Sequence, residues 1–130
     1  MAYSHHYLAF VEHFNRGEYR ACVEPLEELW FAQRDDFHKA LIRLVVGLNQ
    51  LKLGLHSGPR FLFATARELL EPYGAYHQGL DLRTLNAFIA EQEGKIGSQA
   101  GSAEPRFVLE LNPPAATQAL MGVASAAEEA

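Results

Sequence analysis

The sequence predicts an all-α, single-domain bundle of about five helices with an extended C-terminal arm. Apolar residues recur at spacings of three and four along most of residues 1–95, which is the pattern of helices that bury one face. Helical segments follow one another through short turns, with no alternating strand pattern between them. The chain has 130 residues, 48% of them hydrophobic, so it can form one domain with its own core.

The first two helices are predicted at residues 4–17 and 18–30. In the first, Ser4 is a suitable N-cap and Gly17 can end the helix in a left-handed conformation. The apolar stripe of the second contains Pro25, which would remove a backbone hydrogen bond from a helix interior. Either the helix kinks there or it begins anew with Pro25 in its first turn. We favour a kinked, continuous helix.

Three further helices follow. The helix within residues 32–58 is apolar on so much of its surface that we expect it to be central. Gly47 inside it costs roughly 1 kcal/mol relative to alanine, and we expect it to permit the close approach of a neighbouring helix. The other two helices are predicted at residues 59–74 and 81–95, the last capped by Asp81, with a loop between them.

The composition changes after Lys95. A linker leads into a short β-prone arm, at about residues 105–112, in which Phe107, Leu109 and Leu111 share one side. We expect this arm to lie on the helical body. Residues 1–95 are therefore assigned to the helical bundle domain, and residues 96–130 to the linker, the arm and a weakly ordered tail that could form a weak helix.

Charge and composition exclude several classes of protein. The net charge is −5, from 11 basic and 16 acidic side chains, so there is no electrostatic reason to bind nucleic acid or an anionic membrane. No secretion signal is recognisable, and the longest apolar run is too short to span a bilayer. The single cysteine, Cys22, excludes an internal disulfide and a cysteine-based zinc site. We expect a cytoplasmic protein in which Cys22 is a small buried apolar side chain.

Two phrases of the sequence resemble those of a known family. They are "FNRGEYRACVEPLEELW" and "ALIRLVVGLNQLKLGLHSGPRFLF". In content and spacing they resemble the small helical family called domain of unknown function 309, over roughly residues 8–73. The resemblance implies an all-helical fold and no established reaction. The shared positions are Phe14, Asn15, Gly17, Tyr19, Glu24, Leu26, Glu27, Trp30, Leu41, Ile42, Gly54 and Gly58.

The chain departs from the family phrases at polar positions. Ala21 replaces a glutamate, Val23 a histidine, Ala40 a glycine and Arg43 a glutamine. A second histidine, expected near Gln50, is absent. If the family builds a site from histidine, glutamate and glutamine, this chain has lost much of it.

Three glutamates, Glu24, Glu27 and Glu28, share one helix face. Paired carboxylates can bind a divalent cation or act as acid and base. We favour the alternative, a structural role in which these carboxylates accept hydrogen bonds from the backbone or from Arg20 or Arg43. Because a buried arginine requires a carboxylate partner, we expect Arg43 to pair with Glu24 or Glu27.

Trp30 is either a core anchor between helices or a stacking platform for a ligand, and we favour the anchor. His6 and His13 are two helical turns apart and could share a face with a metal ion. No H-E-x-x-H motif or comparable pair of ligands occurs, so we expect all six histidines to be solvated and no metal or cofactor to bind. The candidate polar cluster is Glu24, Glu27, Arg43 and Trp30, with no catalytic residue assigned.

We therefore favour a non-enzymatic interaction or scaffold protein that self-associates. The wide apolar helix and the arm "RFVLEL" could supply the interface. Any further protein partner is unknown. The alternative is a carboxylate-dependent hydrolase that uses Glu24 and Glu27, with or without a metal ion. Glu24 and Glu27 lining an open pocket, or holding an ion, would favour the enzyme. A Glu27→Ala change that only lowers the melting temperature, with no metal bound in the wild type, would favour the interaction domain.

Overall fold

Five α-helices make up most of the computed structural model, which describes residues 3–96 and 107–112. Residues 107–112 are called the arm below. Over the described residues the all-α fold predicted from the sequence is confirmed. The tail predicted at residues 113–130, and most of the linker, lie outside the described residues. The helices are α1 (His5–Asn15), α2 (Val23–Gln33), α3 (Asp36–Lys52), α4 (Ser57–Leu70) and α5 (Leu82–Lys95).

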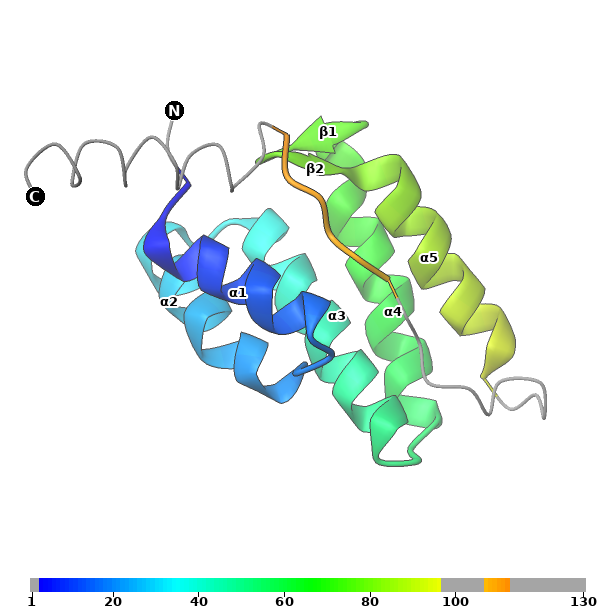
Figure 1. Ribbon diagram of the computed structural model, residues 1–130. Coiled ribbons are helices and arrows are strands. Elements are labelled where there is room, and N and C mark those ends of the chain that lie inside the picture. Colours follow the sequence, from blue (N-terminus) through cyan, green and yellow to red (C-terminus); the bar gives the residue numbers. More distant parts are fainter. Residues whose placement is uncertain (1–2, 97–106, 113–130) are drawn as a thin grey trace, which may run out of the picture.

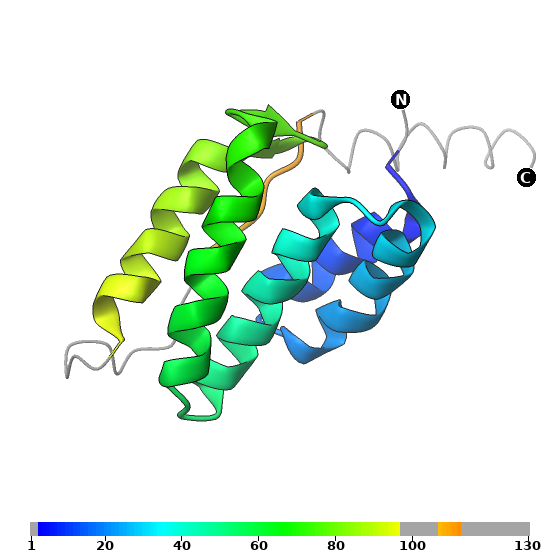
Figure 2. The same cartoon turned by 180° about the vertical axis from the view of Figure 1, so that it is seen from behind.

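Consecutive helices pack side by side in the order of the chain. In Figure 1, α1 and α2 lie on one side of α3, while α4 and then α5 lie on the other. Figure 2 shows the same order from behind, with α3 and α4 nearest the viewer. No helix within the described residues is both long and apolar enough to cross a membrane.

Helix α3 is central, as predicted. Eight of its residues are buried, and its largest contact is with α4. A Cβ atom added to Gly47 would lie 2.7 Å from Cε1 of Phe63 on α4. A side chain at position 47 would therefore displace the Phe63 ring of α4, which agrees with the close approach expected at this glycine.

Polar side chains cap three of the helices, and two of them, Ser4 and Asp81, are at predicted positions. Ser4 accepts a hydrogen bond from the backbone N–H of Tyr7, and Asp35 accepts one from His38. Asp81 accepts from the first-turn amides of α5. Each cap satisfies amides that have no partner within the helix. Helix α4 begins at Ser57, slightly before its predicted start, so Pro59 occupies its third position.

The prediction of a continuous helix kinked at Pro25 is wrong. A 3₁₀ turn, η1 (Arg20–Cys22), precedes α2, which begins at Val23. Pro25 therefore lies in the first turn of α2. At this position a backbone N–H would have no acceptor within the helix, so its absence from proline costs little.

Residues 75–81, predicted as a loop, contain a small hairpin. After the 3₁₀ turn η2 (Glu71–Tyr73), strand β1 (Tyr76–His77) pairs antiparallel with β2 (Leu80–Asp81). The two residues between the strands, Gln78 and Gly79, both have positive φ, which is the geometry of a tight type I′ turn. Strands of two residues are too short to show an alternating pattern in the sequence.

The arm lies between α1 and α5 (Figure 1). Leu109 and Leu111 are buried in the core, and Phe107 is half-buried against it. Val108 and Glu110 point away and are exposed. This alternation is that of an extended segment with one buried side, as the sequence predicts.

Candidate functional site

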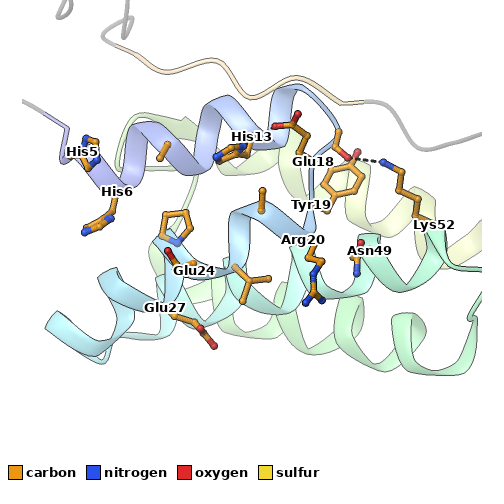
Figure 3. Close-up of a pocket in the computed structure, with 15 residues that line it drawn as sticks. His5, His6, His13, Glu18, Tyr19, Arg20, Glu24, Glu27, Asn49 and Lys52 are labelled. Atoms are coloured by element: carbon orange, nitrogen blue, oxygen red, sulfur yellow. Dashed lines mark hydrogen bonds and ion pairs between the residues drawn. The ribbon is translucent and has the colours of Figure 1, made fainter.

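The glutamates of the candidate cluster line an open hollow on the outside of the bundle (Figure 3). Its walls come from α1, η1, the start of α2 and the end of α3, and it encloses about 1070 Å³. Figure 3 shows Glu24 and Glu27 on α2, His5 and His6 at the start of α1, and Lys52 at the opposite end.

Glu24 and Glu27 are both exposed on this wall. Within the described part of the chain neither carboxylate has a hydrogen-bond or ion-pair partner, and Arg20, one turn before Glu24, forms no ion pair with it. The two glutamates are therefore not part of a buried network. They are solvated charges that could reach a ligand in the hollow.

The polar contacts of the hollow gather around Glu18, at the end where α1 passes into η1. His13 Nδ1 lies 2.8 Å from the Glu18 carboxylate, and this hydrogen bond is the main cause that lowers the pKa of Glu18. Lys52 donates to the carbonyl oxygen of Gly17 at 3.0 Å, and its ammonium lies 5.9 Å from the Tyr19 ring. These contacts tie α1, η1 and α3 together and leave the hollow with charges of both signs.

Arg43 does not pair with Glu24 or Glu27, so this prediction is wrong. Its guanidinium donates to the Thr65 hydroxyl on α4 at 3.0 Å. Arg43 is four residues before Gly47 and so shares the face of α3 that meets α4. It is half-buried rather than enclosed, so water and one hydroxyl can satisfy it without a carboxylate.

Trp30 is half-buried and is not a member of the core cluster, contrary to the predicted anchor role. Instead the guanidinium of Arg34 lies 4.6 Å from the centre of its ring and 5.5 Å from that of Phe31. Arg34 ends α2 in the left-handed conformation, with φ of 56°, and its side chain stacks on both rings. Phe31 is 57% exposed. The candidate cluster is therefore divided among three separate places on the bundle.

No three His, Cys, Asp or Glu side chains among the described residues are grouped so that they could hold a metal ion. Cys22 is fully buried, with its thiol 3.5 Å from the carbonyl oxygens of Phe10 and Glu18. Burial raises the pKa of the Cys22 thiol to about 12, so it is protonated and unreactive at neutral pH.

A second group of polar side chains, not predicted from the sequence, lies at the start of α3 and in the hairpin. His38 is only 2% exposed, and its Nδ1 lies 2.6 Å from the Asp35 carboxylate. The ring of His77 packs against Phe37 and Tyr73, at 4.5 and 4.6 Å between ring centres. Burial is the main cause that lowers the pKa of His77. The expectation that all histidines are solvated is therefore wrong for His38.

A signal for this pair is present in the sequence. Asp35 is an N-cap, and a histidine at the third helical position lies directly beside the cap side chain. The spacing D-x-x-H at a helix start therefore brings carboxylate and imidazole together. The pair joins the side chain that caps α3 to a buried side chain of its first turn, so we assign it a structural role.

Comparison with known proteins found a family model that matches the first part of the chain. Residues 7–62 match the family model described as a domain of unknown function, DUF309. This part of the chain is therefore similar to the DUF309 domain. The match spans most of α1, all of η1, α2 and α3, and the first residues of α4, so it includes most of the hollow and all four residues of the candidate cluster. The DUF309 description assigns no reaction, and neither the curated proteins nor the solved structures contain a match to this chain.

Proposed function

We propose that this protein is a small cytoplasmic interaction domain that self-associates. The observation that carries the proposal is the arm, an extended apolar segment held on the surface of a helical domain. Extended segments that dock by main-chain hydrogen bonds and alternate side chains are a common mode of protein recognition. Here the docked segment belongs to the chain itself, so every copy carries both the segment and its docking surface.

A second feature supports the proposal. Leu53, Leu55 and Phe61, all more than half exposed, lie in or close to the junction between α3 and α4. Single exposed apolar side chains are ordinary, but three so close in the chain provide additional surface for contact with another copy.

Light scattering coupled to size exclusion tests the proposal directly. The chain has a mass of 14.5 kDa. We expect the weight-average mass to rise with loading, from micromolar to millimolar concentration. A mass that stays at the monomer value over this whole range would overturn the proposal.

One observation favours a second candidate function, a hydrolase that uses Glu24 and Glu27. Both carboxylates line the same hollow as His5, His6 and His13. Titration of the protein with Zn²⁺ and Mn²⁺ by calorimetry tests the metal-assisted form of this reaction. Saturable binding that is lost in the Glu24→Gln/Glu27→Gln variant, with no change in melting temperature, would support it. Binding that persists in this variant would count against it.

A further inference from the structure

We propose that two copies of this chain exchange their arms, each arm docking between α1 and α5 of the other copy. The inference rests on the self-association proposed above and specifies its surface and its partner, a second copy. The docking surface is called the arm seat and is defined by Asn15 at the end of α1, Gly79 of the hairpin turn and Phe88 of α5.

The arm seat recognises the main chain of the arm. The Asn15 side-chain amide donates to the Leu109 carbonyl oxygen at 3.0 Å, and its oxygen accepts from the Leu109 N–H at 2.7 Å. This pair of bonds is what a neighbouring β-strand would supply. At the other end of the arm, the Asn112 N–H donates to the Gly79 carbonyl oxygen at 2.9 Å. Because these bonds use no side chain of the arm, they depend only on its extended conformation.

The arm seat also contacts every second side chain of the arm. The Phe107 ring stacks on Phe88, with 4.7 Å between the ring centres. Leu109 and Leu111 are 5% and 8% exposed, whereas Val108 is 60% exposed. The interactions of the arm with the bundle thus come from a six-residue segment. A second copy presents the same segment and can make every one of these contacts.

The segment that connects α5 to the arm determines whether the arm occupies its own seat or the seat of a second copy. Ten residues, "GSQAGSAEPR", join Ile96 to Phe107, and they contain no large apolar side chain. Fully extended, ten residues reach at most about 35 Å. Docking through so short a connection corresponds to an effective concentration on the order of millimolar. Each arm therefore occupies its own seat in dilute solution, and exchange grows as the protein concentration approaches that value.

The geometry of α5 shows how to force the exchange. Phe107 lies against Phe88, and Phe88 is eight residues before Ile96, the residue that follows α5. Eight helical residues span about 12 Å. If residues 97–106 were deleted, the Cα atoms of Ile96 and Phe107 would be about 3.8 Å apart. The arm could then no longer reach its own seat, while the seat of a second copy would remain within reach.

The first experiment compares this deletion variant with the full chain by light scattering at a fixed concentration of 100 µM. We expect the deletion variant to have twice the monomer mass. Adding Leu109→Asp, which places a charge in the buried part of the arm seat, should restore the monomer. Adding Val108→Asp, the matched control on the exposed side of the arm, should leave the dimer intact. A folded deletion variant that is monomeric would overturn the inference, as would a dimer that persists with Leu109→Asp.

A second experiment decides the question if the deletion variant does not fold. Full-length chains carrying Leu109→Asp, which disables the arm, are mixed with chains carrying Asn15→Leu, which disables the seat. Exchange predicts a one-to-one heterodimer in native mass spectrometry, because one intact arm meets one intact seat. The absence of this species at millimolar concentration would refute arm exchange.

The outcomes separate this inference from the proposed function. Self-association of the full chain that is unaffected by Leu109→Asp would overturn arm exchange and leave the interaction domain standing. A full chain that is monomeric at every concentration would overturn the proposed function itself.

Discussion

Replacement of Gly47 by alanine tests the packing of α3 against α4. Alanine is normally favoured over glycine inside a helix, by about 1 kcal/mol. At Gly47 we expect the opposite result. The added Cβ would lie 2.7, 3.1 and 3.3 Å from three carbons of the Phe63 ring, all closer than ordinary van der Waals contact. Phe63 is fully buried, so the ring cannot move without disturbing its neighbours in the core.

The size of the effect follows from these two opposing contributions. Forcing an extra methyl group into a packed core typically costs about 1–3 kcal/mol. Taking about 2 kcal/mol for the clash and about 1 kcal/mol for the helix gain, Gly47→Ala should lower the free energy of unfolding by about 1 kcal/mol. For a domain of this size the melting temperature should fall by about 4 °C.

A second glycine provides the matched control. Gly94 lies in the last turn of α5, and a Cβ added there meets no atom within 4 Å. Gly94→Ala should therefore raise the free energy of unfolding, by about 0.5 kcal/mol. Urea denaturation followed by circular dichroism measures both variants on one scale. If Gly47→Ala is as stabilising as Gly94→Ala, the ring of Phe63 yields without cost and the argument from close approach is refuted.

Three further predictions concern the hairpin, the last helix and the arm. Because burial lowers the pKa of His77, the folded protein binds fewer protons there than the unfolded chain, and stability should fall as the pH drops below about 6.5. His77→Phe, which keeps the ring packing, should flatten that part of the stability–pH curve, and an unchanged curve would count against the burial argument. Asp81→Ala should cost about 1 kcal/mol through loss of the α5 N-cap, measured by urea denaturation, whereas a neutral result would mean that water replaces the cap. Leu109→Ala should cost about 2–3 kcal/mol in the same assay and Val108→Ala less than about 0.5 kcal/mol, so equal costs would contradict the one-sided docking of the arm.

Most of the fold was predictable because its signals are local. The helices follow from the spacing of apolar residues, and their starts from side chains such as Ser4 and Asp81 that cap the amides next to them. The start of α2 was missed because a proline disfavours a helix interior but suits a first turn, and the sequence alone does not decide between the two. The hairpin was missed because its strands have only two residues each.

The candidate site was less predictable because it depends on how helices rotate against one another. Arg43 and Glu24 both seemed to require partners, yet Arg43 meets Thr65 on α4, and Glu24 faces the open hollow. A helical pattern determines which residues share a face, but not which neighbouring helix that face contacts. Trp30 shows the same limit, since its ring is covered by Arg34, whose left-handed backbone conformation no sequence pattern indicated.

The bond between Asn15 and Leu109 has a consequence for the biosynthesis of the protein. The two residues are separated by 94 positions. A ribosome that adds about 5–20 residues per second needs roughly 5–20 seconds to proceed from one to the other. During that interval α1 is already made, but the side of α1 that the arm will cover is bare, and Gly79 and Phe88 complete the arm seat only towards its end. The nascent chain therefore passes through a stage at which chaperones can bind this surface, and the arrival of the arm ends it.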